Sequence, residues 1–142
     1  MDHRSTGHTL MELVVALALM AILLSMVAPR LAALRDRAAV RSAATEVAAT
    51  LASARRVAML HSTGAALVID TGRSTVSVVA AADTVFARSL GDELGVHLSA
   101  TRDTVLYGPS GRAWGASNTS IAVARGRSVD TLFVSRLGRV RH

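Results

Sequence analysis

An uncharged apolar run near the amino terminus is the feature that most constrains this chain. Residues 13–29 carry no charged side chain, and all of them except Ser25 are apolar. Together with the short stretch from residue 8, the run reaches the roughly 20 residues that a helix needs to cross a bilayer. A cleaved secretory signal would place a small-residue cut site after the run, and Pro29 directly behind residues 26–28 makes that site a poor one. We therefore predict a retained membrane-spanning helix.

One carboxylate, Glu12, stands at the start of this run. A charged side chain costs about 2.5–3.5 kcal/mol at the centre of a bilayer and less near its edge, so the carboxylate needs a partner. If the chain is cut after Gly7, the new α-amino group of His8 lies four residues from Glu12, roughly 6 Å along a helix. The same amine of a neighbouring subunit could then pair with it. The alternative is an uncleaved signal anchor whose Glu12 lies in the headgroup layer and reaches water.

Beyond Pro29, small and apolar residues return at gaps of four and three, which makes one stripe along a helix. The stripe consists of Val40, Ala44, Val47, Leu51, Ala54 and Ala58, and the opposite side carries Arg35, Arg37, Arg41, Glu46 and Arg55. Because proline can kink a helix without ending it, we predict one long helix. Residues 8–29 are its transmembrane part, residues 30–62 are its amphipathic continuation, and the Ser-Thr-Gly sequence at 62–64 is the expected stop.

After Gly64 the spacing of apolar residues changes to two, which is typical of strands. Residues 65–69 and 74–80 flank a turn at 70–73 and predict a β-hairpin. Further short β runs cover residues 84–90, 96–99, 104–107, 120–124 and 131–135. Short strands with regular turns predict a small antiparallel β-sandwich over residues 63–142, packed on the helix. The expected fold class is therefore α+β.

Composition and motifs argue against an enzyme. The absence of cysteine excludes disulfides, Cys-ligated zinc and thiol catalysis, and no two of the five histidines stand at i, i+4 spacing. Residues 108–111 lack the spacing of a nucleophile elbow and are expected to form a tight turn. The adjacent Asp92 and Glu93 are expected in a loop beside Gly91 and Gly95. We expect no catalytic residues, no metal and no cofactor.

Arginines gather toward the carboxy terminus. All 16 basic residues of the chain are arginine, and its formal net charge is +6. From residue 105 onward one acid, Asp130, accompanies Arg112, Arg125, Arg127, Arg136, Arg139 and Arg141. Guanidinium groups bind phosphate through two parallel hydrogen bonds, so a mobile tail bearing Arg139 and Arg141 could follow a nucleic-acid backbone. The alternative is a set of solvated surface charges in a chain that uses no lysine.

The amino-terminal pattern resembles the class III signal of type IV pilins and type II secretion pseudopilins. The matching residues are Gly7, Thr9, Leu10, Glu12 and Leu13, followed by an uninterrupted apolar helix with Pro29. The resemblance implies that a prepilin peptidase cuts between Gly7 and His8, removing residues 1–7, and that His8 becomes N-methylated. It also implies that Glu12 and Pro29 serve subunit assembly. His8 departs from the family, which usually has phenylalanine or methionine there.

The carboxy-terminal part resembles the GspH/FimT branch of this family. An aromatic-x-Pro-x-Gly turn starts at Tyr107, hydrophobic strands cover 121–124 and 132–135, and the chain ends in Gly-Arg-Val-Arg at 138–141. The resemblance implies a pilin-like fold and a single-pass inner-membrane protein with a periplasmic domain. The implied partners are other pseudopilins or pilins in a filament, the prepilin peptidase and the inner-membrane assembly platform.

Three functions follow from these features. The first is a GspH-like minor pseudopilin that assembles into the pseudopilus of a type II secretion system. The second is a FimT-like minor type IV pilin that binds DNA for uptake through Gly138, Arg139 and Arg141, with Arg136 beside them. The third is a signal-anchored periplasmic domain that never enters a filament.

Overall fold

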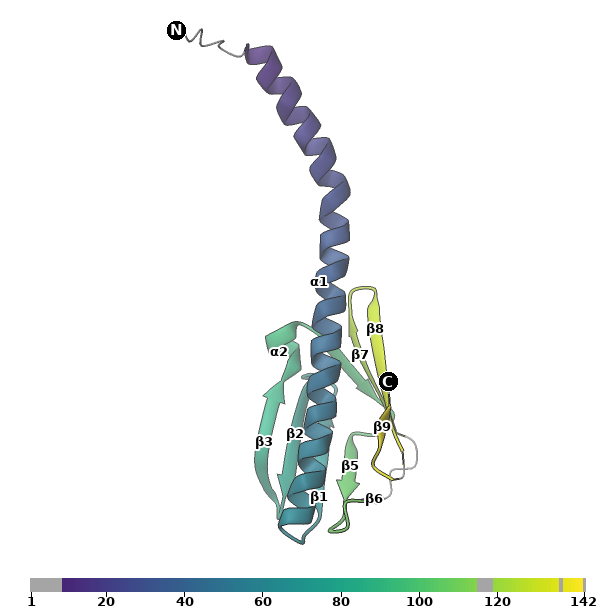
Figure 1. Ribbon diagram of the computed structural model, residues 1–142. Coiled ribbons are helices and arrows are strands. Elements are labelled where there is room, and N and C mark those ends of the chain that lie inside the picture. The colour runs from purple at the N-terminus through teal and green to yellow at the C-terminus, as the bar shows by residue number, and fades with distance from the viewer. Residues whose placement is uncertain (1–8, 115–118, 136, 142) are drawn as a thin grey trace, which may run out of the picture. The chain divides into compact units, whose positions relative to one another are not determined.

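The structure is a computed structural model that describes residues 9–114, 119–135 and 137–141 of the 142-residue chain. Its first element is a single long helix, α1 (Leu10–Leu60), and short strands with a second, short helix follow it (Figure 1). The chain forms two compact units, Met1–Leu34 and Arg35–His142.

In the first unit, α1 presents an apolar surface on all sides. No side chain of residues 10–34 is buried, and leucine, methionine and valine side chains are largely exposed. The helix continues through Pro29 without a break, as predicted. In the part of the chain that the structure describes, α1 is the one helix long and apolar enough to cross a membrane. A surface of this kind needs a covering of lipid or of other helices.

In the second unit, the rest of α1 packs its predicted stripe into the core. All six stripe residues, from Val40 to Ala58, are buried, and Ala39, Ala43 and Thr50 join them. The hydroxyl of Thr50 donates to the Glu46 carbonyl oxygen at 2.8 Å, which satisfies this buried polar group within the helix. Arg35, Arg37 and Arg41 are exposed as expected, whereas Arg55 is partly buried.

The strands form two antiparallel sheets that lie along this part of α1 (Figure 1). The five-stranded sheet has the order β3-β2-β1-β5-β6, with β1 Ala65–Asp70, β2 Thr75–Ala80, β3 Asp83–Ser89, β5 Thr104–Tyr107 and β6 Ala113–Trp114. The four-stranded sheet has the order β4-β7-β8-β9, with β4 His97–Ala100, β7 Thr119–Arg125, β8 Ser128–Val134 and β9 Val140–Arg141. The predicted α+β fold, with a long helix on antiparallel β-sheets, is confirmed.

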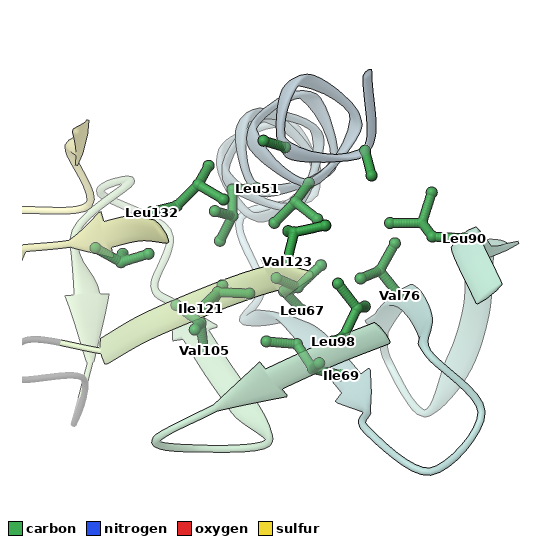
Figure 2. Close-up of a cluster of buried hydrophobic side chains, with 14 of the residues drawn as sticks. Leu51, Leu67, Ile69, Val76, Leu90, Leu98, Val105, Ile121, Val123 and Leu132 are labelled. Atoms are coloured by element: carbon green, nitrogen blue, oxygen red, sulfur yellow. The ribbon is translucent and has the colours of Figure 1, made fainter. Parts of the chain in front are cut away.

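One hydrophobic core joins the helix to both sheets. Figure 2 shows Leu51 of α1 in a cluster that contains side chains of the first sheet, such as Leu67 and Val76, and of the second, such as Val123 and Leu132. Alternation along the strands places one face of each sheet in this core, as the burial pattern of β1 illustrates. Alanines in the stripe of α1 let the helix approach the strands closely, so that valine and leucine fill the remaining space.

All seven predicted strands are present, including the hairpin that pairs Ala65 with Ala80. The last begins three residues earlier than predicted, at Ser128. Helix α1 ends at Leu60, two residues before the expected boundary at 62, because Ser62 adopts a left-handed backbone with φ 51°. The strands β6 and β9 were not predicted, because a strand of two residues is too short to show a periodicity in the sequence.

The prediction of a loop at Asp92 and Glu93 is wrong, because these residues belong to a short helix, α2 (Leu90–Leu94). Ser89 caps this helix. Its hydroxyl accepts from the Asp92 N–H at 3.4 Å and donates to the Asp92 carboxylate at 2.7 Å. Gly95, with φ 61°, ends the helix in the left-handed region.

The turn between β2 and β3 holds two alanines in an unfavourable backbone conformation. Ala81 and Ala82 have φ of 51° and 70°, and they connect the paired residues Ala80 and Asp83. Positive φ at both central residues defines the tight hairpin turn that favours Asn-Gly. A side chain with a Cβ costs about 1–2 kcal/mol in this region, so the turn stores strain.

We predict that Ala81→Asn combined with Ala82→Gly raises the free energy of unfolding by about 1 kcal/mol or more, because both residues tolerate left-handed backbone. Urea unfolding in a nonionic detergent, followed by circular dichroism, measures the change. Ala87→Gly, in the middle of β3, is the matched control, and it should lower stability by about 0.5–1 kcal/mol. A double variant less stable than the parent would refute the account of this turn.

Candidate functional site

The start of α1 carries the residues expected to serve processing and assembly. Gly7 and His8 lie outside the described residues. Thr9 caps the helix, since its hydroxyl accepts from the Glu12 backbone N–H at 3.3 Å. Glu12 lies in the first turn, where the positive end of the helix dipole favours a carboxylate. The first regular residue of α1, Leu10, therefore comes two residues after the expected new amino terminus.

The carboxy-terminal segment is fixed rather than mobile, so the expected mobile tail is wrong for residues 137–141. Val140 pairs with Val134, and Arg141 pairs with Phe133 at the edge of the second sheet. The turn before β9 is closed by Ser135, whose backbone N–H donates to the Arg139 carbonyl at 2.9 Å. The Ser135 hydroxyl in turn accepts from the Arg139 N–H at 3.2 Å.

This segment forms one wall of a groove against α1. The groove has a volume of about 430 Å³ and is lined by Ala48, Leu51, Ala52 and Arg55 of the helix and by residues 138–141. Arg139 and Arg141, predicted together as a basic motif, thus lie beside a third arginine, Arg55. The sequence pattern assigns Arg55 to the solvated face of α1. Its position directly after buried Ala54 is the one signal in the sequence that it stands at the edge of the core.

The tight turn after β5 also lies next to Arg55, which lines this groove. Gly111, with φ 71°, donates its N–H to the Gly108 carbonyl at 2.9 Å, which confirms the turn expected at 108–111. A Cβ atom on Gly111 would lie 3.0 Å from Arg55 Nε, and a Cβ atom on Gly138 would lie 2.9 Å from Tyr107 Cε1. The two motifs of the carboxy-terminal part therefore meet around Arg55, and the positive φ of Gly111 and Gly138, 71° and 72°, disfavours any residue with a side chain at either position.

Arg112, Arg125 and Arg127 of the predicted basic region do not line the groove. Arg125 is engaged elsewhere: its Nε lies 3.1 Å from Asp36 Oδ1 of α1, and its Nη1 donates to the Leu94 carbonyl. Arg112 and Arg127 are exposed, and Arg136 lies outside the described residues. Of the four residues proposed for DNA binding, the structure thus places Gly138, Arg139 and Arg141 together.

Tyr107 forms the buried side of this region. Burial raises the pKa of its phenol above the ordinary 10.0, and the positive charge of Arg55 opposes that rise. The side chain is 1% exposed, so its neutral form is favoured inside the domain. The pKa of Tyr107 is therefore sensitive to the positive charge of Arg55.

Comparison with known families agrees with the amino-terminal pattern. Residues 2–28 match the family defined by the prokaryotic N-terminal methylation motif. No curated protein shows a significant match to the sequence.

Solved structures with the same fold are found among pilus and secretion proteins. The type IV minor pilin FimU of Pseudomonas aeruginosa matches in two crystal forms, with TM-scores of 0.61 and 0.59 and 16% identity in both. These matches cover 72% and 71% of this chain and 86% and 90% of FimU. The minor pseudopilin EpsH of the type 2 secretion system of Vibrio cholerae matches with a TM-score of 0.57 and 12% identity, over 72% of this chain and 94% of EpsH.

The chain thus combines an amino-terminal methylation motif over residues 2–28 with a domain that has the fold of the minor pilin FimU and of the minor pseudopilin EpsH.

We predict that the phenol of Tyr107 titrates with a midpoint above pH 10, measured by absorbance near 295 nm. The chain has one tyrosine, no cysteine and no lysine, so no other side chain has an ordinary pKa between about 9 and 12. Because the folded pKa is raised, the corresponding stability is present below pH 10 and is lost as the pH rises through the folded value. Arg55→Gln should move the midpoint higher still. A midpoint at or below 10 in the folded wild-type protein would contradict this.

Proposed function

We propose that the chain is a minor pseudopilin, similar to GspH, that assembles into the pseudopilus of a type II secretion system. The observation that carries this proposal is the combination in one chain of an amino-terminal methylation motif, a fully exposed apolar helix over residues 10–34 and a pilin-like domain. FimU and EpsH are both minor subunits by name, which supports a minor rather than a major role.

The proposed role is structural and not enzymatic. After the prepilin peptidase removes residues 1–7, the subunit waits in the inner membrane as a single-pass protein with its domain in the periplasm. The assembly platform then extracts it into the filament, where the apolar part of α1 packs among the helices of its neighbours. Pro29 lets this helix bend as it packs.

Glu12 has a defined part in this assembly. Its carboxylate would pair with the α-amino group of His8 in the neighbouring subunit, inside an apolar surrounding where a charge without a counter-ion is costly. The backbone of Glu12 is already fixed by the Thr9 cap, so its position relative to the helix start is set before assembly. Pairing then selects subunits that have been processed, since only a cut chain carries an amine at residue 8.

We predict that Glu12→Gln leaves membrane insertion intact and lowers incorporation into filaments by at least about tenfold, because loss of one partner of a buried ion pair costs about 3–5 kcal/mol. The measurement is the amount of subunit that co-sediments with sheared filaments, against the amount in the membrane fraction. Asp103→Asn, an exposed carboxylate of the domain, is the control. Normal incorporation of the Glu12 variant would refute this role.

The second candidate is a FimT-like minor type IV pilin that binds DNA for uptake. The observation in its favour is that Arg139 and Arg141 line one groove, held there by the pairing of β9. In this case the domain would capture DNA while the helix anchors it in the pilus.

We predict for this candidate that Arg139→Gln with Arg141→Gln weakens binding of double-stranded DNA to the full chain in nonionic detergent. The slope of log affinity against log salt should fall by about 2, because each arginine removed leaves one phosphate without its cation. Fluorescence anisotropy across a salt series measures both. Absence of DNA binding at low salt in the wild-type protein would remove this candidate and leave the structural one.

A further inference from the structure

The second unit begins, at Arg35, with a basic stretch of α1. Arg35 and Arg37 are exposed, and the acid between them, Asp36, is partly buried. Asp36 Oδ1 lies 3.1 Å from Arg125 Nε, so the charge of this carboxylate is balanced within the domain. Neither Arg35 nor Arg37 forms an ion pair with another of the described residues. The start of the unit is therefore locally positive.

The turn between β7 and β8 brings a third exposed arginine to the same place. Gly126 of this turn lies so close to α1 that a Cβ atom on it would clash with the Asp36 carboxylate. Figure 1 shows the turn beside the helix. Arg127 is the next residue and is exposed. We call Arg35, Arg37 and Arg127 the basic patch.

The members of the basic patch point to different sides of α1. Successive residues of an α-helix are rotated by about 100°, so Arg35 and Arg37 differ in direction by about 200°. The turn that carries Arg127 contacts the helix at Asp36, whose direction lies between these two. A rod-shaped ligand such as a nucleic-acid duplex meets a helix from one side. The basic patch instead suits a ligand that surrounds the helix.

The layer of lipid headgroups around a spanning helix has this geometry. Arg35 stands in the same continuous helix six residues after Pro29, the last residue of the uncharged apolar run. Six residues of helix span roughly 9 Å, and the headgroup region is about 5–8 Å thick on each side of a bilayer. The long side chain of arginine covers the difference. Phosphates of anionic phospholipids attract basic residues at this distance from the membrane.

We propose that the basic patch binds the phosphate groups of anionic phospholipids in the leaflet that faces the domain. Contacts from three directions hold the start of the domain against the headgroups while the subunit resides in the membrane. The inference rests on the spanning role of α1 in the function proposed above, and it requires neither a filament nor DNA. Arg139 and Arg141 are not members of the patch, so the two sets of arginines can be tested separately.

The test measures the lipid selectivity of the full chain in phosphatidylcholine vesicles. Electron spin resonance with a trace of spin-labelled phosphatidylglycerol or phosphatidylcholine gives the relative association of each lipid with the protein. We expect the wild type to favour phosphatidylglycerol at least about twofold in about 0.1 M salt. Most of this preference should disappear in about 1 M salt, because the Debye length falls from about 10 Å to about 3 Å.

Three multiple variants assign the preference to the basic patch. The patch variant, which should lose the preference, carries Arg35→Gln, Arg37→Gln and Arg127→Gln. The matched control removes the same charge from exposed positions elsewhere in the domain and should keep the preference; it carries Arg56→Gln, Arg73→Gln and Arg112→Gln. A third variant, with lysine at the three patch positions, guards against misfolding. It should keep most of the preference, because attraction to a charged surface depends on charge rather than on the planar fork of arginine.

The proposal is overturned if the wild type shows no preference, if the patch variant keeps it, or if the control variant loses it as well. A patch variant that keeps the lipid preference but loses affinity for labelled double-stranded DNA in detergent would make the patch a nucleic-acid surface instead. Extraction of the chain from vesicles by alkaline carbonate would refute the spanning helix, and this proposal with it. A chain that stays inserted but shows no lipid preference rejects the patch alone.

Discussion

The domain depends on the packing of one stripe of α1 against two sheets. Valine, leucine and alanine from Val40 to Ala58 pack against both sheets, and strands of each sheet contribute buried side chains from one alternating face. Because both sheets pack against the same stripe of α1, the orientation of the helix about its own axis determines which residues lie at the two edges of that stripe. Arg55 is placed beside the groove in this way, and so are Asp36 and Glu46, which pair with Arg125 and Arg88.

The same helix serves a different purpose over residues 10–34, where its apolar side chains are exposed among the described residues. One continuous element thus carries a stripe suited to a soluble core and a segment suited to lipid or to other helices. This division explains why so small a chain carries so large an apolar fraction, 51% of its residues.

Local patterns predict most of the fold. The helical stripe, the first hairpin and the longer strands follow from periodicities of 3.6 and 2, which neighbouring residues are enough to define. Strand β9 is missed because a two-residue strand has no periodicity, and it exists only because Val140 pairs with Val134 across a short turn. The surroundings of Arg55 are missed because they depend on long-range contacts with Gly111 and Gly138, far along the chain. Helix α2 is missed for a different reason: its capping residue, Ser89, is also the last residue of strand β3, so the sequence pattern reads as the end of a strand.

We propose that this chain is a processed subunit of a pilin-type filament, and the decisive measurement is the mass of the membrane-extracted protein. The chain is expressed in cells that contain a prepilin peptidase and is measured intact. We expect a mass that lacks residues 1–7, with His8 as the amino terminus and one added methyl group. A protein that retains Met1 in these cells would refute processing and favour a signal-anchored domain that never enters a filament.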